Sequence, residues 1–146
     1  MSATYDKHGL HFLYPSDWTL DESNDDDDAT AQVTVLGRDT AFWTVSLYSG
    51  LLDTQQTAAD LLSAMREEYP DLESEEVSEP IGAVLLVGND MRFTYLDLTS
   101  TALTRVFHRG HDTCVVLYQA EDEEMEEVES VMRAMTLSLV GATPAT

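Results

Sequence analysis

The chain of 146 residues carries 28 aspartates and glutamates against seven lysines and arginines, which gives a formal net charge of −21. A surface of this charge repels phosphate backbones and anionic lipid headgroups, so we expect neither nucleic-acid binding nor membrane binding. An apolar fraction of 43% is too high for a disordered chain, and the length predicts a single domain over residues 1–146, with its core over about 5–139.

The first predicted element is a strand in the segment GLHFLYPSDW, residues 9–18. Phe12 and Tyr14 occupy alternate positions, so they are expected to line a buried face of a sheet. Pro15 cannot donate a hydrogen bond to a neighbouring strand, and we expect it to stop this strand at the edge of the sheet. Trp18 follows three residues later and is expected to fold back over this end of the core.

Residues 21–30, DESNDDDDAT, predict an exposed loop. Aspartate and asparagine favour turns, and neighbouring carboxylates repel one another in a regular helix or strand. Two segments with alternating apolar side chains follow, AQVTVLGR and AFWTVSLYS, joined by a short connection. This alternation predicts a hairpin of two antiparallel strands with one buried face.

The apolar spacing then changes from two residues to three or four, which predicts an amphipathic helix over residues 54–69. Its apolar positions are Ala58, Leu61, Leu62, Met65 and Tyr69. Asp53 or Thr54 can cap the start of this helix, and Pro70 ends it because a proline ring cannot continue helical hydrogen bonding.

Four or five further strands are predicted to form an antiparallel meander. LESEEVSEP is an acidic segment typical of an edge strand. IGAVLLVGND and MRFTYLDL flank a predicted turn at Gly88, Asn89 and Asp90. TALTRVFHRG and HDTCVVLYQA are expected to meet near Gly110.

The segment EDEEMEEVESVMRAM, residues 121–135, predicts a second amphipathic helix, with its glutamates at the N-terminal end where the helix dipole favours negative charge. A short extended segment, TLSLV, and a disordered tail over 141–146 are expected to follow. Runs of strands with two interspersed helices predict an α+β fold, an antiparallel β-sheet flanked by helices.

The N-terminal pattern of a glycine, an alternating aromatic strand, Tyr-Pro, a short polar gap and a tryptophan resembles the opening of domains in the PsbP-like superfamily. In this chain the pattern consists of Gly9, Phe12, Tyr14, Pro15 and Trp18. The resemblance extends over residues 5–139 through the order of the elements. It implies an α/β/α sandwich around an antiparallel sheet, and a binding or assembly role more often than catalysis.

That superfamily includes the extrinsic PsbP subunit of photosystem II, a Ran-binding nuclear import factor and small bacterial proteins of unknown role. We expect neither named role here, because the N-terminal residues show no secretory signal and no residue matches a Ran-binding surface. Cys114 is the single cysteine, and no segment has the length of an apolar membrane span. A cytoplasmic protein without disulfides is therefore expected.

His108, His111 and Cys114, in the segment HRGHDTC, are candidates for a Zn²⁺ or other transition-metal site, because imidazole and thiolate groups are ligands that these metals prefer. The three residues straddle the predicted turn at Gly110, where alternate positions face opposite sides of a sheet. The histidines can converge across the turn, whereas Cys114 is expected to be a small buried hydrophobic residue. We expect no metal here and keep the two histidines as candidates.

Asp25 and Asp27 in the acidic loop are candidates for a Ca²⁺ site, because Ca²⁺ prefers oxygen ligands. The loop lacks the ligand spacing of an EF-hand, and consecutive aspartates point in different directions. We expect a solvated loop without a defined metal site.

No catalytic residue and no cofactor are predicted, since the sequence has no G-x-S-x-G, Walker A or G-x-G-x-x-G motif. The favoured function is a non-catalytic protein-interaction or assembly module that uses a sheet face, a loop or its acidic surface to hold a protein partner. If there is such a partner, we expect a basic protein. One alternative is an acidic secretion-type chaperone, a class that is often dimeric. Another is a small-ligand-binding protein or enzyme with a pocket between the sheet and the helix at 54–69. A simpler explanation of the charge is a surface adapted to hold water and ions.

Overall fold

The computed structural model describes residues 1–141, which form nine strands and two helices. The strands are β1 (Ser2–Lys7), β2 (Leu10–Pro15), β3 (Thr19–Asp21), β4 (Ala31–Leu36), β5 (Phe42–Ser49), β6 (Glu73–Ile81), β7 (Val84–Tyr95), β8 (Leu98–Arg109) and β9 (Asp112–Glu121). The helices are α1 (Thr54–Glu68) and α2 (Asp122–Gly141), and neither has the length and apolar character needed to cross a membrane. Apart from Gly141, the predicted tail lies outside the described residues.

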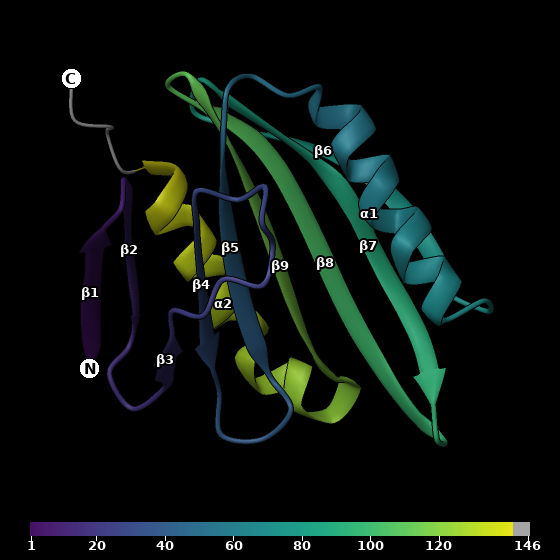
Figure 1. Cartoon of the computed structure of the whole chain (residues 1–146). Helices are drawn as coiled ribbons and strands as arrows, with labels where there is room; N and C mark the ends of the chain where they lie inside the picture. Colours follow the sequence, from purple (N-terminus) through teal and green to yellow (C-terminus); the bar gives the residue numbers. More distant parts are fainter. Residues whose placement is uncertain (142–146) are drawn as a thin grey trace.

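Seven strands form one antiparallel sheet in the order β3-β4-β5-β9-β8-β7-β6. α1 packs on one face of this sheet, against β7 and β8, and α2 packs on the other face, against β8 and β9 (Figure 1). The predicted α+β class and the α/β/α sandwich are therefore confirmed. The acidic edge strand is confirmed as well, because β6 ends the sheet on one side.

Each face of the sheet has its own core, because neighbouring residues of a strand point to opposite faces. Val106 packs with Ala58 under α1, whereas the next residue, Phe107, belongs to the larger core under α2. Trp43, the largest fully buried side chain among the described residues, also lies in the α2 core. Both helices are therefore needed to cover the central strands.

α1 begins and ends where the sequence predicts. The Asp53 carboxylate accepts a hydrogen bond from the backbone N–H of Gln56 (3.1 Å) and so caps the first turn. Tyr69 forms the C-terminal cap, directly before Pro70. The hairpins β4–β5 and β8–β9 also form as predicted, the second turning at Gly110 with a φ of 62°.

The N-terminal segment differs from the prediction, because it forms a separate two-stranded sheet, β1–β2, and not an edge of the main sheet. His8 and Gly9 make its turn with φ of 56° and 81°, the left-handed values typical of a tight hairpin. β2 lies against α2 and places the Phe12 ring 4.7 Å from the Trp43 ring, centroid to centroid. The hairpin thus covers the α2 core beside the helix, and Trp18 packs against the same core as expected.

A second difference lies at Gly88, where the sequence predicts a turn but β7 continues without interruption. Glycine is needed here because two strands approach closely: a Cβ on Gly88 would lie 1.8 Å from the carbonyl oxygen of Thr104 in β8. The turns that flank β7 lie at Gly82, with a φ of 61°, and at Leu96 and Asp97, with φ of 51° and 64°. A glycine that permits close backbone contact was therefore mistaken for a turn residue.

The third difference is the length of α2, which continues to Gly141 through the segment TLSLV that the sequence predicts as extended. Its alternating side chains resemble a strand, but Thr136 and Leu139 prolong the buried stripe of the helix. The Thr136 hydroxyl accepts a hydrogen bond from Trp43 Nε1 (3.0 Å) and donates one to the Met132 carbonyl oxygen (3.0 Å). This residue joins the end of α2 to the centre of the core.

The contact between Thr136 and Trp43 leads to a first prediction. Thr136→Val keeps the shape of the side chain but leaves the buried indole N–H without its acceptor, so we expect a loss of about 1–3 kcal/mol in the free energy of unfolding. Thr136→Ser retains the hydroxyl and should lose clearly less. Urea denaturation of the two variants measures the difference, and a valine variant as stable as the serine variant would contradict this account.

Candidate functional site

Both histidine candidates lie at the end of the β8–β9 hairpin and are exposed. His108 Nε2 is 2.6 Å from the carbonyl oxygen of Leu52, to which it donates a hydrogen bond when the ring carries its proton there. His111 follows Gly110 in the turn between the strands. His108 is thus in contact with the loop between β5 and α1, a contact that serves the fold.

Cys114 faces the opposite side of the sheet from His108. Val106, two residues before His108 in β8, packs under α1, whereas Cys114 is fully buried in the α2 core. Burial raises the pKa of the Cys114 thiol to about 11, so the thiol stays protonated at neutral pH. Cys114 and His108 therefore lie on opposite faces of the sheet, and the fold does not bring the thiol and this imidazole together.

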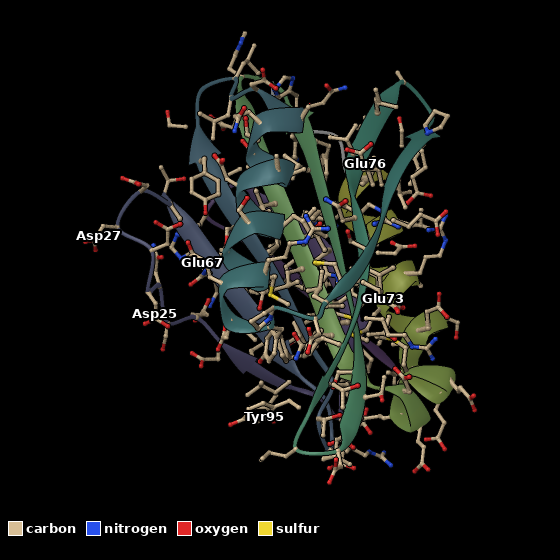
Figure 2. All side chains as sticks on the ribbon, turned by 90° about the vertical axis from the view of Figure 1, so that its right-hand side faces the viewer. Asp25, Asp27, Glu67, Glu73, Glu76 and Tyr95 are labelled. Atoms are coloured by element: carbon tan, nitrogen blue, oxygen red, sulfur yellow. The ribbon has the colours of Figure 1, made fainter. Side chains whose placement is uncertain are left out.

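Asp25 and Asp27 are exposed at the outer rim of the acidic loop (Figure 2). The aspartate between them is the one that the fold uses: Asp26 accepts hydrogen bonds from the Tyr48 hydroxyl (2.5 Å) and the backbone N–H of Asp28 (2.9 Å). The bond from Tyr48 lowers the pKa of Asp26 below its usual range. Within residues 1–141, no three His, Cys, Asp or Glu side chains are grouped as a metal site requires.

A groove with a volume of about 560 Å³ brings together three segments that are distant in the sequence. These are the turn between β2 and β3, the loop between β4 and β5, and the first half of α2. We call this feature the Trp18 groove, and its volume lies within the range of natural ligand sites. Its lining residues are Pro15, Asp17, Trp18, Arg38, Asp39, Glu123, Glu124, Glu127, Val128 and Val131.

The indole of Trp18 is held on one side by the fold and borders the groove on the other. Its backbone N–H donates to the Pro15 carbonyl oxygen (3.0 Å), which closes the turn after β2. A Cβ built on Gly37 would lie 3.6 Å from Trp18 Cζ2 and 3.1 Å from Ala41 Cβ, so the ring packs closely over the end of β4. The half-buried ring therefore has one side packed against the fold and another side that borders the groove.

Hydrogen bonds also fix the β4–β5 loop against α2. The Glu124 carboxylate accepts from the backbone N–H of Thr40 (2.8 Å) and from its hydroxyl (2.5 Å). The same hydroxyl accepts from the backbone N–H of Glu121 (3.0 Å). These hydrogen bonds link the two acidic walls of the groove, one from the loop and one from the helix.

The groove is strongly acidic, with five carboxylates and one guanidinium among its lining residues. Arg38 pairs with Asp17, and this guanidinium holds the pKa of the Asp17 carboxyl below its usual range. The carboxylates of Asp39, Glu123 and Glu127 form no ion pair within residues 1–141. Three negative charges therefore remain to attract a cation from outside.

This arrangement fits the recognition of an ammonium or guanidinium group. A cation over the face of an indole is attracted by the ring, and nearby carboxylates add direct charge pairing. Pro15, Val128 and Val131 offer apolar surface to the methylene stem of a lysine or arginine side chain. The lining contains no serine, cysteine, histidine or lysine that could act as an activated nucleophile.

The sequence does not predict the Trp18 groove. The glutamates at the start of α2 have an ordinary explanation in the helix dipole, and Arg38 and Asp39 occupy a turn where polar residues are common. The one available signal was Trp18, a large aromatic residue directly after a turn. Its acidic neighbours become visible only when the three segments are placed together in space.

A second cavity, with a volume of about 480 Å³, lies between α1 and the strands β6 and β7. We call it the α1 cavity, and it occupies the place that the small-ligand alternative requires. Its lining residues are Gln55, Ala58, Ala59, Leu62, Ser63, Arg66, Glu76, Val77, Ser78, Val87, Gly88 and Asn89. None of these residues is a histidine or a cysteine, and polar side chains from both the helix and the strands contribute to the lining.

No family model and no curated protein sequence matches the chain. Solved structures do resemble it, at 11% sequence identity. The cyanobacterial PsbP protein (CyanoP) of Synechocystis sp. PCC 6803 matches with a TM-score of 0.69, covering 94% of this chain and 90% of its own.

Two further structures match over similar lengths, also at 11% identity. PA94 of Pseudomonas aeruginosa, described as a protein of unknown function and putative regulator, has a TM-score of 0.55 and covers 99% of this chain and 98% of its own. LpqN of Mycobacterium tuberculosis, described as involved in cell envelope biogenesis, has a TM-score of 0.54 and covers 100% of this chain and 91% of its own. At this identity the likeness shows the fold alone: the chain has the PsbP-like fold that its N-terminal motif implies.

Proposed function

We propose that this protein is a non-catalytic interaction module that binds a basic segment of a partner protein in the Trp18 groove. The observation that carries the proposal is the arrangement of five carboxylates around a half-buried indole. A lysine or arginine side chain placed there meets negative charge at its head and apolar surface along its stem.

The net charge of the whole chain supports the same class of partner. A formal charge of −21 attracts a basic protein over a distance and speeds its encounter, and this attraction weakens as salt is added. The groove supplies short-range contacts that a uniformly solvated acidic surface lacks. If the acidic surface serves only to hold water and ions, binding of a basic peptide should not depend on the groove. This expectation distinguishes a solvated surface from a binding site in the groove.

A blocked peptide with four arginines separated by glycines tests the proposal. Glu123 and Glu127 are both changed to lysine, and we expect affinity for the peptide to fall about tenfold. Trp18 fluorescence measures binding at 50 and 500 mM salt, because Trp43 is fully buried and its signal should not respond. Higher salt should weaken binding to the unchanged protein.

The matched control carries the same change of net charge on the outer surface of α1. Glu67 and Glu68 are both exposed and lie outside the Trp18 groove, so Glu67→Lys with Glu68→Lys should weaken the peptide by no more than twofold. If both double variants lose the same affinity, the binding comes from net charge alone and the groove is not the site.

A further inference from the structure

The outer side of β6 is an open edge of the seven-stranded sheet. β6 is nine residues long, and no strand of the described chain pairs with its outer side. Figure 2 shows this side of the molecule, with α1 and α2 to either side of the sheet and Glu73 and Glu76 labelled on β6. An edge strand of this length presents a row of backbone N–H and C=O groups that a further strand can use.

The side chains of β6 define which strand can pair with it. β6 carries four glutamates, Glu73, Glu75, Glu76 and Glu79, and no lysine or arginine. Like charges directly opposite each other destabilise a strand pair, so the glutamates disfavour antiparallel pairing of two copies of β6. The same charges favour an incoming strand with basic side chains. Charge complementarity therefore selects a basic partner over a second copy of this chain.

A buried polar group beside β6 is left without a partner. Asn89 in β7 lines the α1 cavity and is only 3% exposed. Its backbone N–H donates to Thr104 Oγ1 (3.1 Å), but its side-chain oxygen Oδ1 accepts no hydrogen bond within residues 1–141. Buried acceptors without donors are rare in folded proteins, and a water molecule, an ion or a group from a partner can supply the missing donor.

The register of the sheet connects the open edge to this acceptor. Glu76 in β6 pairs with Asn89 in β7, and Asn89 pairs with Thr104 in β8. A residue opposite Glu76 in an added strand would extend this row on the α1 face, two strand spacings, or roughly 10 Å, from Asn89. A side chain at that position would point to the same face of the sheet as Glu76 and the α1 cavity. Arg66, which also lines the cavity, donates to Ser74 Oγ (2.9 Å).

We propose that the edge of β6 binds an extended basic segment of a partner protein as an eighth strand, and that one lysine or arginine of this segment enters the α1 cavity between Glu76 and Asn89. Backbone hydrogen bonds to β6 supply affinity, and the cavity selects the side chain and the register. This surface lies apart from the Trp18 groove, so the inference goes beyond the function proposed above.

A blocked peptide of alternating lysine and valine, seven residues long, is the probe. Two-dimensional NMR of the labelled protein should show shifts in the β6 amides and slower hydrogen exchange there. The same peptide N-methylated along the edge that faces β6 keeps its charge but cannot donate backbone hydrogen bonds, and we expect it to bind at least about tenfold more weakly. Equal binding of the two peptides would show that no strand is added.

Two variants test the cavity. Glu76→Gln should weaken binding of the alternating peptide about threefold or more. Glu67→Gln, on the exposed surface of α1, should leave the affinity unchanged. Asn89→Leu removes the acceptor and should weaken a lysine-containing peptide more than one whose central lysine is replaced by norleucine. If the peptide shifts only residues of the Trp18 groove, this inference is wrong while the proposed function stands. If the peptide shifts only residues of β6, this inference stands while the proposed function is wrong.

Discussion

Gly88→Ala is expected to destabilise the protein by about 3 kcal/mol, at the upper end of the range for overpacked cores. The added Cβ would lie 1.8 Å from the oxygen and 2.6 Å from the carbon of the Thr104 carbonyl, and backbone atoms of a central strand cannot move aside cheaply. The same carbonyl accepts a hydrogen bond from Nη1 of the buried Arg105 (2.8 Å), so displacing it also disturbs a charged group. Urea denaturation of the variant measures the loss.

Gly141→Ala is the matched control for this substitution. Among residues 1–141, no atom lies within 4 Å of a Cβ built on Gly141, and the residue lies at the end of α2, where alanine is favourable. This variant should be as stable as the unchanged protein or slightly more stable. A Gly88→Ala protein with the same midpoint as Gly141→Ala would show that β7 and β8 do not approach as closely as described.

Glu79→Gln is expected to lower the free energy of unfolding by about 2–3 kcal/mol, because it removes the main partner of a buried guanidinium. The Arg105 side chain is only 5% exposed, and its Nε donates to Glu79 Oε1 (3.0 Å). Glu79 also accepts from Arg133 of α2 (3.1 Å), so the glutamate joins the sheet edge to the helix. Asp90 stays near Arg105 (2.9 Å), which keeps the expected cost at the lower end for a broken buried pair.

The stabilisation that Glu79 provides depends on pH, because only the ionised carboxylate pairs with the two guanidinium groups. Hydrogen bonding from Arg133, with a further contribution from Arg105, lowers the pKa of Glu79 in the folded protein. Its contribution is therefore fully present above the unfolded pKa, about 4.3, and is lost as the pH falls through the lower folded value. The difference in unfolding free energy between the unchanged protein and Glu79→Gln should be constant near pH 7 and shrink below about pH 4.

Asp17→Asn provides a comparison at an exposed ion pair. Asp17 and Arg38 have side chains that are 51% and 79% exposed, and exposed pairs of this kind contribute little to stability because water and salt screen their charges. A loss at Glu79 no larger than the loss at Asp17 would mean that the Arg105 charge is solvated after all, contrary to the burial described here.

Local features of the sequence predicted the elements whose signals are complete within a few residues. The cap at Asp53 and the stop at Pro70 define α1, and the turn at Gly110 defines the β8–β9 hairpin. The edge position of β6 follows from its many glutamates. In each case the deciding contact lies within the element itself or with its neighbour in the chain.

The errors arose where a residue serves a distant contact. Gly88 is required by the Thr104 carbonyl of the next strand, and Thr136 is helical because it meets Trp43 across the core. β1 has a single buried apolar side chain, Tyr5. It therefore lacks the alternation of apolar and polar residues that predicts a strand. Local propensity cannot weigh these contacts, because each depends on packing between segments far apart in sequence.

The candidate site shows the same limit more strongly. Each pair of residues proposed from the sequence is local in the chain, yet the fold leaves the two histidines exposed at the end of a hairpin and the two aspartates exposed in a loop. The Trp18 groove instead combines Trp18 with Arg38 and Glu127. Trp18 and Glu127 are separated by most of the sequence. Only the tertiary arrangement makes these charges neighbours.

The strand order has a consequence for synthesis on the ribosome. β6 to β9 each pair with a strand adjacent in the chain, so this half of the sheet can assemble as soon as it emerges. β5 instead reaches the sheet through β9, with Ser49 opposite Asp112, and β4 follows through β5. When the nascent β4–β5 hairpin leaves the exit tunnel, β9 and α2 have not yet been made, so Trp43 still lacks its contact with Thr136. A chain released before β9 is made would keep that apolar hairpin open to aggregation.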